Sequence, residues 1–83
     1  MEDVLLIARS ITRAQRMDSE LRRRGITAEL IRPPVGLTDK GCAYALRLPQ
    51  RQMEPALRIL QATGLVPYQI FRRNGNDVRE VVL

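Results

Sequence analysis

The sequence predicts an α+β domain, a ferredoxin-like βαββαβ sandwich with a short extra strand at its C-terminal end. Two observations carry this prediction: short segments in which apolar residues alternate with period 2, and two stretches of helical apolar spacing, each followed directly by a glycine. Eighty-three residues suffice for one such domain and are too few for two. We therefore expect residues 1–83 to form a single ferredoxin-like domain.

The first half of the chain predicts strand, helix, strand. Residues 4–8 are apolar on both alternating faces, which is typical of a central strand covered on both sides. Ser10 offers a hydroxyl N-cap to a helix that Gly25 ends. One stripe of that helix is apolar: Ile11, Ala14, Met17 and Leu21. Residues 26–30 alternate again and predict a second strand, which stops before Pro33.

The second half predicts a loop, a strand, a helix and a hairpin. Residues 33–41 hold two prolines and two glycines without periodicity, which indicates a connecting loop. The segments that follow are a strand over 42–48, a helix over 52–63 closed by Gly64, and a strand over 66–73. Asn74-Gly75 is a two-residue hairpin signal, and residues 77–83 would form the extra strand.

Composition narrows the classes of function. The chain has 14 basic and 9 acidic residues and a net charge of +5, which favours acidic or anionic partners. One cysteine and no histidine leave no ligand set for structural zinc and no Ser-His-Asp or Cys-His machinery. We expect no cofactor and no autonomous catalysis. The first apolar run is far shorter than the roughly 18 residues of a membrane span, so we expect a cytoplasmic protein without a membrane partner.

Cys42 carries the side chain with the greatest potential for covalent chemistry. In the predicted topology the third strand lies antiparallel between the first two, so its first residue should lie beside the start of the first helix, near Arg9, Ser10 and Thr12. A helix N-terminus and nearby arginines favour a thiolate and can also hold an anion. Gly41 lets the backbone approach a partner closely. The alternative is that Cys42 is a small buried apolar residue.

The run from Pro33 to Arg47 resembles the core of small bacterial proteins described as selenium/sulfur carrier-like. In that family a proline-containing loop leads to a cysteine and then to a short apolar strand that ends in Leu-Arg or similar. The first helix of this chain also matches the family's pattern: Ser10, Ala14, Asp18, Leu21 and Gly25. The residue after the cysteine is often glycine in relatives and is Ala43 here.

The resemblance implies that Cys42 carries a sulfur or selenium atom as a persulfide or selenosulfide. The partners would then be a donor enzyme, such as a cysteine desulfurase, and an acceptor protein of unknown identity. Thiolate attack through a mixed intermediate is the chemistry that such transfer requires.

Two other functions stay open. In the first, the chain is a small-molecule or anion-binding regulatory module, with Arg9, Ser10, Thr12 and Gly41 as ligands and no covalent chemistry. In the second, it binds nucleic acid, which fold and charge permit. Because the predicted first strand carries no aromatic residue on which a base could stack, we expect no specific nucleic-acid partner.

A homodimer is also expected. With both helices on one face of the sheet, the other face would expose either Leu5 and Ile7 or Val4 and Leu6, next to Ala43 and Ala45. An apolar strip left in water usually marks an interface.

Overall fold

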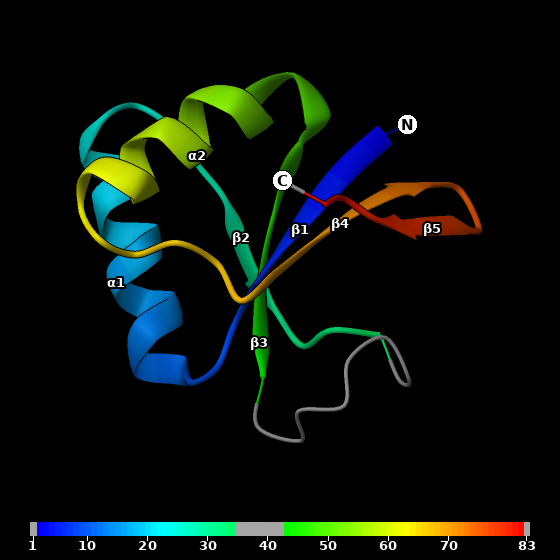
Figure 1. Ribbon diagram of the computed structural model, residues 1–83, viewed down its shortest axis with the longest axis horizontal. Helices are drawn as coiled ribbons and strands as arrows, with labels where there is room; N and C mark the ends of the chain where they lie inside the picture. The colour runs from blue at the N-terminus through cyan, green and yellow to red at the C-terminus, as the bar shows by residue number, and fades with distance from the viewer. Residues whose placement is uncertain (1, 35–42, 83) are drawn as a thin grey trace.

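The computed structural model describes residues 2–34 and 43–82, and these form a five-stranded antiparallel sheet and two helices (Figure 1). The elements in chain order are β1 (Glu2–Ala8), α1 (Ile11–Arg23), β2 (Glu29–Ile31), β3 (Tyr44–Pro49), a 3-10 turn η1 (Gln50–Gln52), α2 (Met53–Ala62), β4 (Gln69–Asn74) and β5 (Asp77–Glu80). The strand order is β2-β3-β1-β4-β5. The predicted α+β class is confirmed. Gly41, Cys42 and most of the predicted loop over 33–41 lie outside the described residues.

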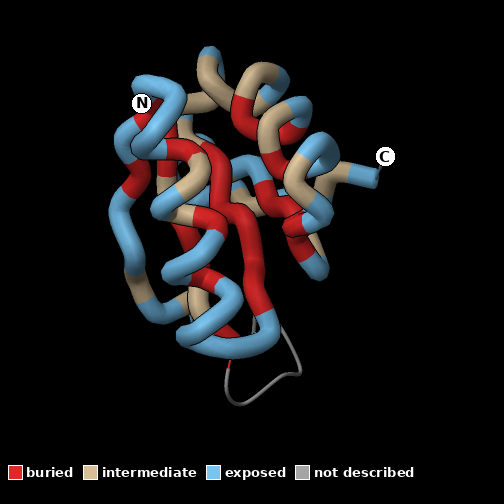
Figure 2. The backbone as a smooth tube through the Cα atoms, turned by 90° about the vertical axis from the view of Figure 1, so that its left-hand side faces the viewer, coloured by how far each residue is buried: buried red, intermediate tan, exposed pale blue. Residues whose placement is uncertain are grey.

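β1 is the central strand and is buried on both faces. It pairs with β3 on one side and β4 on the other, and all residues from Val4 to Ala8 are at most 1% exposed (Figure 2). Val4, Leu6 and Ala8 belong to one core cluster, whereas Leu5 and Ile7 belong to another. The prediction of a doubly covered central strand is therefore confirmed.

The larger core cluster lies between the sheet and the two helices, which pack on the same face (Figure 1). α1 buries Ala14, Met17 and Leu21 there, at the predicted helical spacing. Ile11, the first residue of the predicted stripe, is instead 37% exposed, because it lies in the first turn of α1 beyond the packed part of the helix.

Both ends of α1 are fixed by local sequence. The Oγ atom of Ser10 accepts a hydrogen bond from the Arg13 amide at 3.2 Å, which satisfies one of the unpaired N–H groups of the first turn. At the other end Gly25 has φ of +87°, and the Ile26 amide donates to the Leu21 carbonyl at 2.9 Å. This is a Schellman motif, and it brings two buried apolar side chains, Leu21 and Ile26, together.

α2 ends in the same way. Gly64 has φ of +74°, and the Leu65 amide donates to the Leu60 carbonyl at 2.8 Å. Both predicted glycine stops are therefore confirmed. Pro55 is the third residue of α2, where the absence of its N–H costs no intrahelical bond.

The strands β2 and β4 each begin three residues later than predicted, and prolines explain both shifts. β2 begins at Glu29 rather than Ile26, because Thr27 would face Pro49 in the register, and Pro49 has no N–H to donate. β4 begins at Gln69 rather than Val66, since Pro67 likewise cannot donate to β1.

The hairpin turn also differs from the prediction. The turn residues are Gly75 and Asn76, not Asn74 and Gly75, because Asn74 still pairs with Asp77 in the β4–β5 ladder. Gly75 has φ of +62°, the backbone region required at the first central position of a type II′ turn. β5 ends at Glu80 and extends the edge of the sheet next to β4.

The face of the sheet away from the helices holds the smaller cluster: Leu5, Ile7, Ala43, Ala45 and Phe71. Of the two predicted alternatives, the structure selects Leu5 and Ile7 as the residues that share this face with the two alanines. The expectation that these side chains lie in water is wrong, because Leu5, Ile7 and Ala45 are 0% exposed. In the register Leu5 lies between the long side chains of Arg47 and Phe71, which cover apolar surface.

The predicted homodimer was based on an exposed apolar strip on this face, and the residues of that strip are buried within the single chain. Self-association stays a prediction, without support from an exposed strip at these positions.

Ile7→Arg is expected to unfold the chain rather than to yield a soluble monomer, because the substitution places an unpaired charge among buried apolar side chains. Circular dichroism and sedimentation velocity measure the two outcomes directly. Arg79→Glu, at an exposed position of β5, is the control and should stay folded. A folded monomeric Ile7→Arg would contradict the assignment of Ile7 to the core.

Ser10→Ala should lower the free energy of unfolding by about 0.5–2 kcal/mol, because the Arg13 amide loses its acceptor. Ser19→Ala, at an exposed position within α1, is the matched control and should be neutral or slightly stabilising. Urea unfolding of the three proteins checks this. Equal effects of the two substitutions would show that Ser10 does not act as a cap.

Candidate functional site

The strand register brings several segments together at one end of the strands. Ala8, the last residue of β1, lies opposite Tyr44, the first residue of β3. Ile31, where β2 ends, lies opposite Ala45, and Gln69, where β4 begins, lies opposite Ile7. Since α1 begins three residues after Ala8, this end of the strands also holds the N-terminus of α1. We call it the α1-start end.

The predicted site residues fall partly inside and partly outside the described residues. Cys42 and Gly41 lie outside them. Ala43, to which Cys42 is joined, is 2% exposed and packs in the cluster that holds Ile7 and Ala45. The described chain next to Cys42 thus lies at the α1-start end.

Arg9, Ser10 and Thr12 surround the N-terminus of α1, and all three are exposed. The Arg9 guanidinium lies 4.4 Å from the centre of the Tyr68 ring, a cation–π contact that holds its charge beside the helix start. The side chain of Ser10 caps the helix. The amides of Ile11 and Thr12 have no carbonyl acceptor within an α-helix, so the helix start presents N–H groups and partial positive charge.

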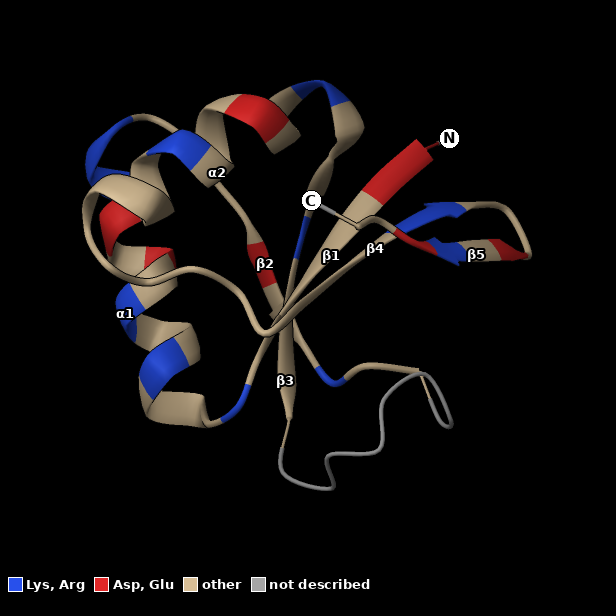
Figure 3. Ribbon diagram, viewed as in Figure 1, with Lys and Arg blue, Asp and Glu red and all other residues tan. Residues whose placement is uncertain are grey.

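Two further arginines add charge at this end. Arg13 donates to the Gly64 carbonyl at 3.4 Å, which joins the start of α1 to the segment that follows α2. Arg32, just after β2, lies 4.8 Å from the centre of the Tyr44 ring. In Figure 3 the described ribbon around the start of α1 and just after β2 carries the colour of basic residues and none of the colour of acidic residues.

A second candidate region lies at the opposite end of the sheet, where β1 begins and β3 ends. An open groove of about 750 Å³ is bounded there by Glu2 and Asp3 of β1, residues 27–29 around the start of β2, and residues 47–51. Asp3 and Arg9 are six residue steps apart along extended chain, so the groove lies roughly 20 Å from the α1-start end.

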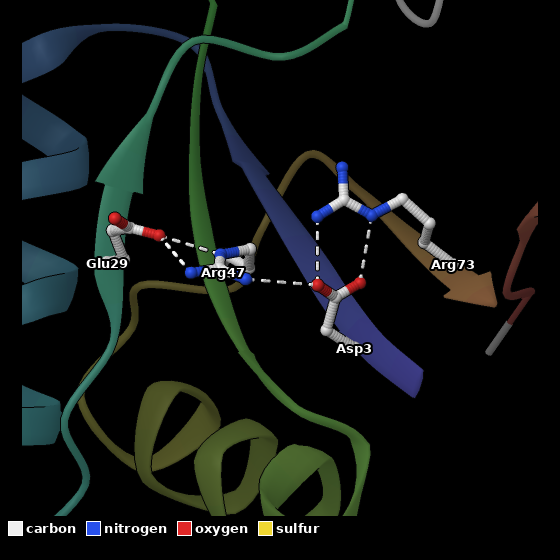
Figure 4. Close-up of polar contacts among 4 residues, drawn as sticks. All are labelled: Asp3, Glu29, Arg47 and Arg73. Atoms are coloured by element: carbon white, nitrogen blue, oxygen red, sulfur yellow. Dashed lines mark hydrogen bonds and ion pairs between the residues drawn. The ribbon is translucent and has the colours of Figure 1, made fainter. Parts of the chain in front are cut away.

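A chain of alternating charges runs beside this groove across four neighbouring strands (Figure 4). Glu29 of β2 accepts from Arg47 Nε of β3 at 2.7 Å. Arg47 also reaches Asp3 of β1 at 3.4 Å. Arg73 of β4 holds both carboxylate oxygens of Asp3, at 3.1 and 2.8 Å. A bidentate arginine–carboxylate pair of this kind fixes geometry as well as charge.

The same contacts set the protonation of these groups. Hydrogen bonds from Arg73, reinforced by its charge and by Arg47, lower the pKa of Asp3, although burial opposes the shift. The hydrogen bond to Asp3 raises the pKa of Arg73, and the bond to Glu29 raises the pKa of Arg47. Asp3 therefore stays ionised at neutral pH and cannot act as a general acid there. These four side chains neutralise one another, which is the behaviour of a structural network.

Sequence reasoning missed this network. Its signal was present in the alternation of β1, because Asp3 shares a face with Leu5 and Ile7, but the partners on other strands become visible only once the register is known.

A family model described as "Putative Se/S carrier protein-like" matches residues 3–72, from the start of β1 into β4. The chain belongs to this family. The match includes the start of α1 and the whole segment that contains Cys42. No curated protein and no solved structure matches the chain. Neither helix in the described part of the chain is long and apolar enough to cross a membrane.

Asp3→Asn should lower the free energy of unfolding at pH 7 by about 1–2 kcal/mol, because the three hydrogen bonds that Asp3 accepts from Arg73 and Arg47 lose the carboxylate charge at a partly exposed site. The lowered pKa of Asp3 adds stability that is present above its unfolded value of about 3.9 and is lost as pH falls through the folded value. The variant should therefore lose less stability between pH 5 and pH 2 (roughly the range in which carboxylates titrate).

Urea unfolding as a function of pH measures both effects. Asp77→Asn is the control, because its pair with Arg79 is largely exposed and should contribute little. Identical acid profiles for wild type and Asp3→Asn would contradict the role assigned to Asp3.

Proposed function

We propose that this protein is a non-catalytic sulfur or selenium carrier that holds its cargo on Cys42 as a persulfide or selenosulfide. The observation that carries the proposal is the register of Ala8 opposite Tyr44, which brings the chain next to Cys42 to the positively charged start of α1. The family match supports the same reading.

The α1-start end holds groups that stabilise a thiolate without a histidine. A cysteine near a helix N-terminus and arginine side chains has a lowered pKa, because these groups stabilise the anion. The capped start of α1 with Arg9 and Arg13 supplies both features at this end of the sheet.

Transfer of sulfur needs no net oxidation. The Cys42 thiolate attacks the outer sulfur of a persulfide on the donor enzyme, a new S–S bond forms on Cys42, and the bond between the donor's two sulfurs breaks. The donor cysteine leaves as a thiolate. A second transfer of the same kind delivers the atom to an acceptor protein. The step starts from a free Cys42 thiol, which a reducing compartment maintains, so the proposal includes a cytoplasmic location.

The fold proposal can also be taken further than the α+β class. We propose that β1 to β4 with the two helices form a ferredoxin-like unit and that β5 is an addition at its edge. The placement of β3 between β1 and β2 and the packing of both helices on one face support this.

Anion binding is the second candidate. Arg9, Ser10 and Thr12 are exposed around unpaired helix amides, which is an arrangement suited to a phosphate or carboxylate. In that case Cys42→Ala would leave binding unchanged.

Intact mass spectrometry after incubation with a cysteine desulfurase and cysteine tests the carrier proposal. We expect wild type to gain one sulfur atom, reversible by a thiol reductant, because persulfides exchange with thiols. Cys42→Ser should gain none. A wild-type mass that stays unchanged while the desulfurase itself carries a persulfide would contradict the proposal.

A further inference from the structure

We infer that the exposed surface around the start of α1 is the docking surface for a partner protein that presents acidic side chains around an apolar centre. We call it the docking patch and define it by Arg9, Ile11, Arg13, Val66 and Tyr68. The inference rests on the proposed function, because a carrier must meet both its donor and its acceptor near its cysteine, and the described chain next to Cys42 lies at the α1-start end.

The apolar part of the docking patch is unusual for this chain. In the described residues five large apolar side chains are exposed: Ile11, Leu30, Val66, Tyr68 and Val82. Three of the five belong to the docking patch. The Tyr68 amide donates to the Ile7 carbonyl at 2.8 Å, and Arg13 reaches Gly64, so the segment that carries Val66 lies against the start of α1.

The charge of the patch selects the partner. Arg9 and Arg13 belong to the patch, and Arg32 lies nearby over Tyr44. Among residues 2–34 and 43–82, no carboxylate lies in the first turn of α1 or between α2 and β4. The carboxylates of this part of the chain belong to later turns of α1 or to other elements: Glu2, Asp3, Asp18, Glu20, Glu29, Glu54, Asp77 and Glu80. The docking patch therefore attracts an acidic surface over a distance and binds it through apolar contact at short range.

Two other occupants fit less well. A second copy of this chain in a two-fold contact would place Arg9 and Arg13 against themselves or each other, and like charges repel. A nucleic-acid base would need an open aromatic face, but the Arg9 guanidinium lies over the Tyr68 ring. An acidic protein surface meets the apolar and the cationic requirement together.

Amide shift mapping with a synthetic acidic peptide tests the inference. The probe is a twelve-residue peptide of glutamate, aspartate, leucine and phenylalanine, titrated into the ¹⁵N-labelled full chain. We expect the largest shift changes at residues 9–13 and 64–68. Arg9→Glu with Arg13→Glu should weaken binding at least about tenfold, and Val66→Ser about threefold, because charge and apolar contact both contribute.

The matched control is Arg51→Glu with Arg58→Glu, which makes the same change in net charge at exposed positions outside the docking patch. It should weaken binding less than about threefold, through long-range attraction alone. Arg9→Gln with Arg13→Gln gives a milder variant, and the dispersion of its spectrum verifies folding. Equal losses in both double variants, shifts centred elsewhere, no binding, or tighter binding of a single-stranded RNA of equal charge would overturn the inference.

The result separates this inference from the carrier proposal. Cys42→Ser should bind the peptide as wild type does, because the docking patch does not include the thiol. Peptide binding without sulfur loading would retain the docking patch and remove the carrier. Sulfur loading without peptide binding would do the reverse.

Discussion

The structure depends on β1 being buried on both faces and paired on both edges. Its five residues from Val4 to Ala8 are nearly inaccessible, and each large side chain of this kind contributes about 1.5–3 kcal/mol when it leaves water. Because alternate side chains point to opposite faces, this one short segment contributes residues to both core clusters. A chain of 83 residues has little other means of joining two cores.

The two ends of β1 also differ in the charges that surround them. Asp3 at its beginning joins a charge network that spans four strands and neutralises itself. Arg9 follows its end, where α1 begins and the charges of the described side chains are all positive. The two ends of the same strand thus differ in charge: the described side chains at one end neutralise one another, and those at the other end leave an excess of positive charge.

Local signals in the sequence predicted most of the fold. Ser10, Gly25 and Gly64 marked helix ends because capping depends on residues close in the chain. The hairpin was misplaced by one residue, since turn position follows from strand register, which is a non-local property. The arginine partners of Asp3 could not be predicted for the same reason, because they lie on neighbouring strands. The sequence did not predict which side chains cover Leu5 and Ile7, because this depends on the long side chains of neighbouring strands.

The candidate site was predicted less completely. Topology placed the start of β3 beside the start of α1, and the register of Ala8 with Tyr44 agrees with that placement. Arg9 over Tyr68 and Arg13 at Gly64 could not be predicted, because they depend on how the segment after α2 returns to the sheet. The role of Cys42 lies beyond the described residues and is a matter for experiment.

The pH dependence of Cys42 alkylation tests the central claim most directly. The rate of iodoacetamide labelling follows the thiolate fraction, so its midpoint gives the pKa of the thiol. The account predicts a midpoint clearly below the value of about 8.5 for a free cysteine, with the urea-denatured chain as the internal reference. A midpoint at or above that of the denatured chain, or protection of the thiol until the fold is lost, would contradict it.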